Sequence, residues 1–242
     1  MTHEGRVALV TGAGQRLGRS FALALAQRGA ALAVHYNSSA DGAEETVASI
    51  VSRGGRAVAF QCDLTDPACP ERLISDVVAT LGRLDILVNS AAVMERTPVG
   101  EVEVEVWDRM FALNLRAPFF LAQAAAAVMP AGSTIINISD LAAFENWPAY
   151  IPHGISKAGI VRMTESLARV LAPGIRVNGI APGAVLLPDD WNPEQSSHFI
   201  ETTPLGKIGD ASDAVGALLY LLDASFVTGE TIVVDGGRRI RK

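Results

Sequence analysis

Short apolar segments with the composition of β-strands alternate with helix-like segments along the whole 242-residue sequence. Strand-like runs are expected at 6–12, 30–36, 56–63, 84–91, 133–139, 175–183 and 230–237. Helical patterns are expected at 19–29, 41–55, 70–82, 103–112, 115–129, 152–171 and 213–223. Because strands that are apolar throughout need cover on both faces, this order predicts an α/β fold with a parallel sheet between two helical layers. We expect a single Rossmann-type, doubly wound domain of about seven strands over residues 1–242.

Residues 184–209 interrupt this alternation. The segment follows the sixth expected strand and contains three prolines and a tryptophan. Ligands of doubly wound proteins bind beyond the carboxyl ends of the strands. A long insertion at that end is therefore expected to cover the substrate.

Charge and composition argue against several kinds of partner. The net charge is −6 and no lysine- and arginine-rich block occurs, which argues against nucleic acid and anionic membrane surfaces. No run of about 18 apolar residues is present, so no membrane span is expected. The first residues do not resemble a signal peptide, and Cys62 and Cys69 have no metal-like spacing. His3, His35 and His198 have none either. We expect a reduced, cytoplasmic protein without a metal site that acts on a small molecule.

A glycine-rich stretch, "TGAGQRLGRS" at 11–20, connects the first expected strand to the first expected helix. Gly12, Gly14 and Gly18 would allow a tight turn and a close approach of the backbone to a pyrophosphate at the helix N-terminus. An ordinary glycine-rich turn is the alternative. The position of the stretch between a first strand and a helix favours dinucleotide binding.

The end of the second expected strand bears on which dinucleotide binds. An NAD site usually has an acidic residue there to hold the ribose 2′-hydroxyl. This chain has Asn37, Ser38 and Ser39 instead, and Arg16 lies in the glycine-rich stretch. A guanidinium and hydroxyl groups suit a 2′-phosphate, so NADP(H) is the expected cofactor. The alternative is that Arg16 is a solvated surface residue.

Further motifs follow in the order "CDLTD" (62–66), "VNSAA" (88–92), "NLRAPFF" (114–120), "IRVNGIAPG" (175–183) and "VDGG" (234–237). Together with the glycine-rich stretch they resemble the short-chain dehydrogenase/reductase family over almost the whole chain. With the residues at the end of the second strand, this resemblance implies cofactor contacts from Gly12, Gly14, Arg16, Leu17, Gly18, Asn37, Ser38, Ser39, Asp63, Leu64, Asn89, Ser90, Ala91, Lys157, Pro182 and Gly183.

Within that family the chain is most similar to the pteridine reductase branch. The similarity lies in the glycine-rich stretch with its arginine, in "HYNSS" (35–39), in Asp140 and in "LLPDDW" (186–191). That branch reduces pterins with NADPH. Met94 stands where the branch has a phenylalanine that stacks on the pterin, and a methionine contacts rings less specifically.

The family's active site is a serine, a tyrosine and a lysine together with an asparagine. Lys157 matches the lysine and Asn114 the asparagine, whereas His153 stands at the tyrosine position and Asp140 at the serine position. Ser139 is adjacent, but strand alternation points it to the other face. An imidazolium is a competent acid near pH 7. Lys157 disfavours that charged form of His153 and Asp140 favours it.

The sequence therefore predicts an NADPH-dependent reductase of a small C=O or C=N compound, pterin-like or another heterocycle, with His153 as the acid. One alternative is a catalytically silent NADP-binding homologue in which His153 only occupies the site. A second is a non-redox lyase that uses His153 and Asp140. A third is that Tyr150 reaches the substrate. The expected substrate pocket comprises Met94, Trp147, Tyr150, Leu187 and Trp191.

The family commonly forms tetramers through its long central helices. Here the segments 112–129 and 159–172 are rich in alanine and apolar on one side. Such faces suit close helix packing across a symmetric interface, so a homotetramer is expected.

Overall fold

The computed structural model describes residues 2–185 and 193–240. Its central element is a seven-stranded sheet in which every pair of neighbouring strands is parallel. The strands are β1 (Val7–Val10), β2 (Ala31–Tyr36), β3 (Ala57–Gln61), β4 (Ile86–Asn89), β5 (Ser133–Ile138), β6 (Ile175–Pro182) and β7 (Thr231–Val234). The predicted α/β fold class and number of strands are confirmed.

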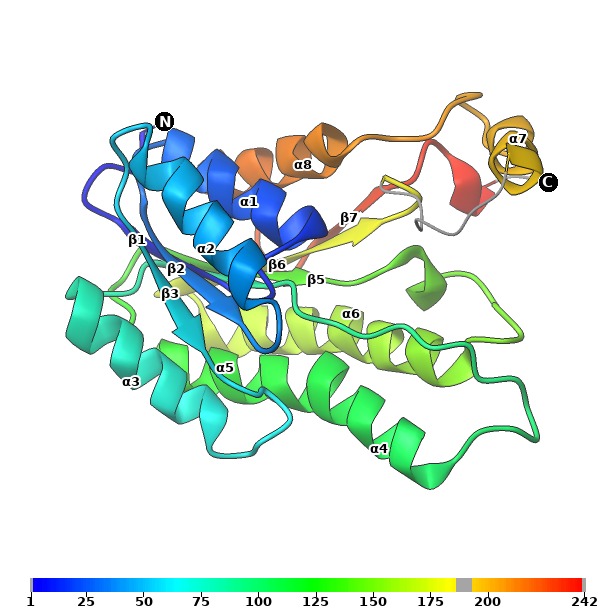
Figure 1. Cartoon of the computed structure of the whole chain (residues 1–242), viewed down its shortest axis with the longest axis horizontal. Helices are drawn as coiled ribbons and strands as arrows, with labels where there is room; N and C mark the ends of the chain where they lie inside the picture. Colours follow the sequence, from blue (N-terminus) through cyan, green and yellow to red (C-terminus); the bar gives the residue numbers. More distant parts are fainter. Residues whose placement is uncertain (1, 186–192, 241–242) are drawn as a thin grey trace.

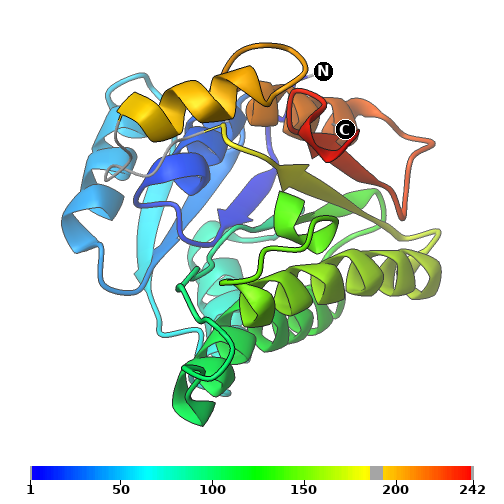
Figure 2. The same cartoon turned by 90° about the vertical axis from the view of Figure 1, so that its right-hand side faces the viewer.

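The strand order is β3-β2-β1-β4-β5-β6-β7, so the direction of winding reverses between β1 and β4. In doubly wound sheets ligands bind at this switch point, outside the carboxyl ends of the strands. Those ends lie on the right in Figure 1 and face the viewer in Figure 2.

Helices cover both faces of the sheet (Figure 1). One layer holds α1 (Arg16–Gln27), α2 (Ala40–Val51) and α8 (Ala211–Asp223), and the other holds α3 (Cys69–Leu81), α4 (Val104–Phe111), α5 (Ala117–Ala126) and α6 (Ile151–Leu171). A π-helical turn, η1 (Ala112–Arg116), joins α4 to α5, and short 3-10 turns, η2 (Leu141–Ala143) and η3 (Arg238–Ile240), follow β5 and β7. The sequence patterns located the helices to within a few residues.

The core consists of two apolar clusters, one on each face of the sheet. Leu9 and Leu87 pack with α3 and α5, whereas Val10 and Val88 pack with α1 and α8. Successive strand residues point to opposite faces, so strands buried on both sides consist mostly of apolar residues. This packing fixes the strand register and thereby the level at which the loops of the carboxyl edge emerge.

The expectation of reduced cysteines is wrong for this structure, because Cys62 and Cys69 form a disulfide. Cys62 follows β3 and Cys69 begins α3, and the turn between them returns the chain on itself. Their Cα atoms are 6.1 Å apart, within the range that a disulfide spans. The spacing in the sequence gave no sign of this turn.

The described parts of the segment 184–209, residues 184–185 and 193–209, lie at the carboxyl edge of the sheet. Its residues Pro193–Glu201 form α7, which crosses that end of the molecule in Figure 2. The predicted pocket residues Leu187 and Trp191 lie outside the described residues. Within the described ranges, no helix is long and apolar enough to cross a membrane.

Candidate active site

A cavity of about 1390 Å³ lies at the carboxyl edge, between the glycine-rich stretch and the start of α6. The structure brings most of the predicted site residues together on its walls. They are Gly12, Gly14, Arg16, Leu17, Gly18, Asn37, Ser38, Ser39, Asp63, Leu64, Ser90, Ala91, Met94, Asp140, Trp147, Tyr150, His153, Lys157, Pro182 and Gly183.

Two predicted site residues, Asn89 and Asn114, do not line this cavity. The Asn89 amide donates hydrogen bonds to Asn137 Oδ1 at 2.9 Å and to the Pro118 carbonyl at 3.4 Å. Its side chain therefore ties β4 to β5 and α5 inside the core, and the expected contact between Asn89 and a cofactor stays a prediction. The sequence motif located the end of the strand but not the face to which this side chain turns.

The glycine-rich stretch packs so closely that side chains would not fit. A Cβ atom on Gly12, whose φ is +66°, would lie 3.1 Å from Ala91 Cα, and one on Gly18 would overlap the carbonyl of Gly12. Arg16 has a φ of 48°, a left-handed conformation that is uncommon for a residue with a side chain. The loop thus presents bare backbone to the cavity and holds one guanidinium group beside it.

His35, which was not predicted as a site residue, is hydrogen-bonded to the backbone of this loop. Its Nδ1 lies 3.2 Å from Gly12 N, and its Nε2 lies 3.0 Å from the Cys62 carbonyl oxygen. Because an amide N–H can only donate and a carbonyl can only accept, His35 is neutral with its proton on Nε2. Burial is the main cause that lowers the pKa of His35 from 6.5 to about 4. A histidine inside an otherwise apolar strand was the signal that could have found it.

This lowered pKa makes stability depend on pH. Between about pH 6.5 and 4 the unfolded chain binds a proton at His35 that the folded chain does not, so the stabilising contribution is full above pH 6.5 and is lost as pH falls. The loss is expected to reach about 3 kcal/mol. Denaturant unfolding of wild type and His35→Asn should show a shallower pH dependence for the variant over this range. Parallel curves for the two proteins would contradict the assignment.

The residues after β2 line the same cavity as Arg16. Asn37, Ser38 and Ser39 line it without a carboxylate among them. Asp63 also lines it, but its Oδ1 accepts hydrogen bonds from Thr65 N at 2.8 Å and Thr65 Oγ1 at 2.7 Å, which orders the turn after β3.

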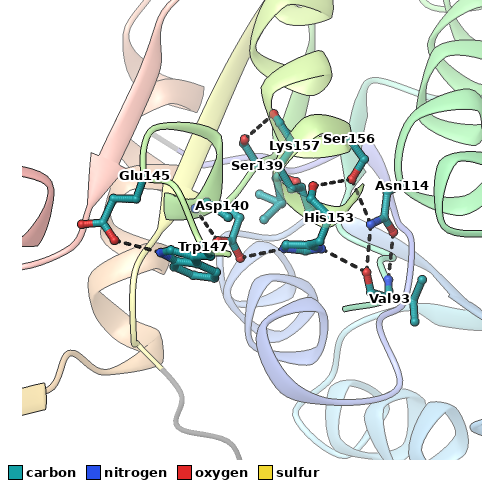
Figure 3. Close-up of polar contacts among 11 residues, drawn as sticks. Val93, Asn114, Ser139, Asp140, Glu145, Trp147, His153, Ser156 and Lys157 are labelled. Carbon is teal, nitrogen blue, oxygen red and sulfur yellow. Dashed lines mark hydrogen bonds and ion pairs between the residues drawn. The ribbon is translucent and has the colours of Figure 1, made fainter. Parts of the chain in front are cut away.

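His153, on the first turns of α6, is 2 % exposed and lies between two oxygen atoms (Figure 3). Its Nδ1 is 3.2 Å from the Val93 carbonyl oxygen, so Nδ1 carries a proton. Its Nε2 is 3.5 Å from Asp140 Oδ2 and has no hydrogen-bond partner. Both ring nitrogens of His153 therefore face oxygen atoms.

Asp140 is oriented by its own backbone. Its Oδ1 accepts a hydrogen bond from Ala142 N at 2.8 Å and caps η2, which leaves Oδ2 facing His153. The neighbouring Ser139 hydroxyl donates to the Lys157 carbonyl at 2.9 Å. Ser139 is therefore engaged with the α6 backbone, and Asp140 alone of the two faces His153 in Figure 3.

Asn114 contacts His153 indirectly, through the backbone of Val93. Its Oδ1 accepts from Val93 N at 2.9 Å, and its Nδ2 donates to the Val93 carbonyl at 2.8 Å and to Ser156 Oγ at 3.2 Å. The π-helical turn η1 carries Asn114 at its centre. The same Val93 carbonyl contacts His153, so Asn114 fixes the plane in which the imidazole lies.

Lys157, one helical turn after His153, is 4 % exposed, and its Nζ donates to the Ile138 carbonyl at 3.0 Å. Burial lowers the pKa of the Lys157 ammonium group, and the Asp140 carboxylate opposes part of this shift.

Aromatic side chains and a methionine form the outer wall. The rings of Trp147 and Tyr150 meet edge to face with centroids 6.2 Å apart, and Trp147 Nε1 donates to Glu145 Oε2 at 2.9 Å. Met94 is 47 % exposed beside them. Arg96, Phe199 and Arg238 are among the lining residues that were not predicted, because no motif connects these distant positions. In the described part of the chain, no three His, Cys, Asp or Glu side chains gather where they could hold a metal ion.

The doubly wound sheet, the bare glycine-rich loop and the large cavity at the switch point define a dinucleotide-binding protein. A histidine, a carboxylate and a lysine meet in the same cavity. Fold and site together therefore define the class of dinucleotide-dependent enzymes.

Comparison with known proteins identifies the family. The family described as enoyl-(acyl carrier protein) reductase matches residues 12–239. The L-rhamnose 1-dehydrogenase (NAD(P)(+)) of a Sphingomonas species is 34 % identical over 97 % of this chain and 96 % of its own length. The chain belongs to the short-chain dehydrogenase/reductase family of oxidoreductases.

Two solved structures show how closely the fold agrees. The angucycline C-6 ketoreductase LanV with bound NADP is 34 % identical, with a TM-score of 0.92 over 98 % of this chain and 96 % of the other. The FolM alternative dihydrofolate reductase 1 from Brucella canis, complexed with NADP, is 30 % identical, with a TM-score of 0.93 over 98 % of this chain and 95 % of the other.

Proposed function

We propose that this protein is an NADPH-dependent reductase of a small C=O or C=N compound and that His153 is its proton donor. The observation that carries the proposal is the Nε2 atom of His153. It belongs to a buried side chain on the cavity wall and has no hydrogen-bond partner. Asp140 Oδ2 lies 3.5 Å from it without forming a hydrogen bond, so a substrate oxygen or nitrogen would supply the hydrogen bond that this buried atom lacks.

Each neighbour has a distinct task in this proposal. Bound NADPH would supply the hydride. His153 donates the Nε2 proton to the substrate heteroatom as negative charge develops there. Asp140 stabilises the protonated imidazole, and Asn114 and Val93 hold the ring in place. The Lys157 ammonium group adds positive charge beside the developing anion.

The proposed cofactor is NADP(H), as in the two related structures solved with NADP. Bare backbone at Gly12 and Gly18 fits a pyrophosphate, and Arg16 with Ser38 and Ser39 fits a 2′-phosphate. Asn37, Ser38 and Ser39 line the cavity after β2 without a carboxylate to hold a ribose 2′-hydroxyl, which disfavours NAD(H).

NADPH is expected to bind at least about tenfold more tightly than NADH, a difference of about 1.4 kcal/mol. Arg16→Ala should shrink the difference, because it removes the guanidinium from the cavity wall. Arg19→Ala is the matched control, since Arg19 lies on the same helix and pairs with Glu45 at 2.8 Å. Calorimetry that gives equal affinities of wild type for the two cofactors would reject the preference.

The test of the proposed function is NADPH oxidation by wild type with a panel of dihydropterins, quinones, ketones and cyclic imines. The same panel should be run with His153→Tyr, which restores the family's usual acid. Turnover by wild type supports the reductase. A wild type that binds NADPH but turns over nothing, beside an active His153→Tyr, would favour the silent NADP-binding alternative.

The pterin-like substrate stays part of this proposal. Its support is the sequence resemblance, the aromatic wall at Trp147 and Tyr150, and the relative that is a dihydrofolate reductase. We further propose that the chain forms a single domain and that the protein is cytoplasmic. We also propose that segment 184–209 covers the substrate, since Phe199 of α7 lines the cavity.

A homotetramer is also proposed. Exposed apolar side chains on α5, Phe119 and Phe120, are 40 % and 43 % exposed, and Val170 on α6 is 76 % exposed. Light scattering at micromolar concentration is expected to give about four times the mass of one chain. A stable monomer would contradict this assembly.

A further inference from the structure

The loop after β4, residues 93–97, is bonded at both ends to the residues around the start of α6, which carries His153. At one end the Val93 carbonyl contacts His153 Nδ1 at 3.2 Å and accepts a hydrogen bond from Asn114 at 2.8 Å (Figure 3). At the other end Thr97 N donates to the Ala149 carbonyl at 2.7 Å, and Thr97 is buried. The three residues between these anchors are therefore held beside the reacting centre.

The side chains of these three residues have different surroundings: one pairs with α4, and two line the cavity. Glu95 pairs with Arg109 of α4 at 2.8 Å, which neutralises both charges. Met94 and Arg96 line the cavity. Arg96 makes no hydrogen bond or ion pair with any part of the chain that the structure describes, so its guanidinium remains available to a ligand.

Arg96 places a positive charge on the cavity wall, although the chain as a whole has a net charge of −6. Arg238 lines the same cavity and is positioned by the Phe199 ring at 3.8 Å and by Thr202 Oγ1 at 2.9 Å. Among the described lining residues on the substrate side, the only carboxylate is Asp140, which faces His153. A concave surface lined by charge of one sign concentrates ions of the opposite sign.

We infer that the substrate carries an anionic group, a carboxylate, that Arg96 binds while the carbonyl oxygen faces His153. This inference rests on the proposed function and names its substrate class. Met94 and the Trp147–Tyr150 pair provide an apolar surface for the ring or chain that separates the two groups. A guanidinium binds a carboxylate through two parallel hydrogen bonds, which makes Arg96 a specificity-determining residue.

The experiment compares an acid with its neutral ester. The probes are 4-acetylbenzoate and methyl 4-acetylbenzoate, which differ only in the charged group. Their affinities for the NADP⁺-loaded protein are measured by calorimetry, and their reduction is followed by NADPH oxidation. Wild type should bind the acid at least about tenfold more tightly than the ester, and added salt should reduce the difference.

The variants are Arg96→Ala, Arg96→Lys and the control Arg162→Ala. Arg162 is an exposed residue of α6 that pairs with Glu165 at 2.7 Å and does not line the cavity. Arg96→Ala should abolish the preference for the acid and raise its KM without changing kcat or the ester's affinity. Arg96→Lys should restore part of the preference, and Arg162→Ala should behave as wild type.

Equal affinities of wild type for acid and ester, or binding of neither, would overturn the inference. So would a preference for the acid that survives in Arg96→Ala. Failure of the proposed function has a different signature, because the acid would then bind with its Arg96-dependent preference while NADPH is not oxidised with either probe.

Discussion

His153→Phe is expected to lower kcat/KM for a verified substrate by about 10² to 10⁴-fold, the usual contribution of a positioned general acid. Phenylalanine fills the buried site but offers no proton at the Nε2 position. The dissociation constant of NADPH should change by less than about threefold, because the glycine-rich loop and Lys157 hold the cofactor in our proposal. Stopped-flow turnover and calorimetry separate the two effects.

The pH profile provides an independent test of the same residue. Because the donor must be protonated, kcat/KM for reduction should fall as pH rises through the range in which an imidazolium loses its proton. A phenolic acid would not lose its proton in that range. Asp140→Asn should move the fall to lower pH, because it removes the carboxylate 3.5 Å from Nε2.

Tyr150→Phe is the matched control for an alternative acid. Tyr150 lines the cavity but precedes α6, and its ring contacts Trp147. We expect its kcat/KM to stay within about fivefold of wild type and to keep the pH dependence. If His153→Phe turned over substrate at the wild-type rate, His153 would not be the donor, and an effect confined to Tyr150→Phe would transfer the role to Tyr150.

Lys157→Met should impair both cofactor binding and turnover. Met is similar in length and apolar, so it fills the space of Lys157 while removing the charge and the hydrogen bond to Ile138. Without the cation, Asp140 would be the remaining charge beside His153, and the developing negative charge of the substrate would lose its stabilisation. We expect kcat to fall by about 10²-fold and the affinity for NADPH by about tenfold.

Stability measurements show whether the losses of turnover and NADPH affinity in Lys157→Met are caused by unfolding. Thermal unfolding of the apo protein should show a folded Lys157→Met variant, since the substitution also removes the cost of burying a cation. Arg162→Ala serves again as the control on α6, because its side chain is exposed. A folded Lys157→Met variant with wild-type affinity and turnover would show that the lysine has no part in the site.

The architecture could be predicted from the sequence because it depends on local and periodic properties. Apolar runs separated by helical patterns determined seven parallel strands with helices on both faces, and glycines at positions 12, 14 and 18 marked the phosphate loop. The spacing of His153 and Lys157 placed them one turn apart on one helix. These inferences need only the geometry of single elements and the rule that ligands bind at the carboxyl edge.

The resemblance to a family indicated which residues belong to the site, but it could not show what surrounds their side chains. It placed Asn89 at the cofactor, whereas the side chain turns into the core and binds Asn137. It placed Asn114 at the active site, and only the structure shows that Asn114 acts on His153 through the Val93 backbone. The orientation of a side chain depends on its neighbours from other elements, which a motif does not contain.

Only the tertiary structure decided the contacts that give the site its chemistry. The sequence left open whether Asp140 or Lys157 controls His153, because the answer depends on distances across a turn and a helix. Packing puts Asp140 3.5 Å from Nε2 and ties the Lys157 ammonium to Ile138. Packing likewise joined His35 to Gly12, Cys62 to Cys69, and Arg96 to the cavity wall. Each of these contacts joins separate segments of the chain, so no local pattern encodes it, whereas the alternation of strands and helices is encoded locally at every step.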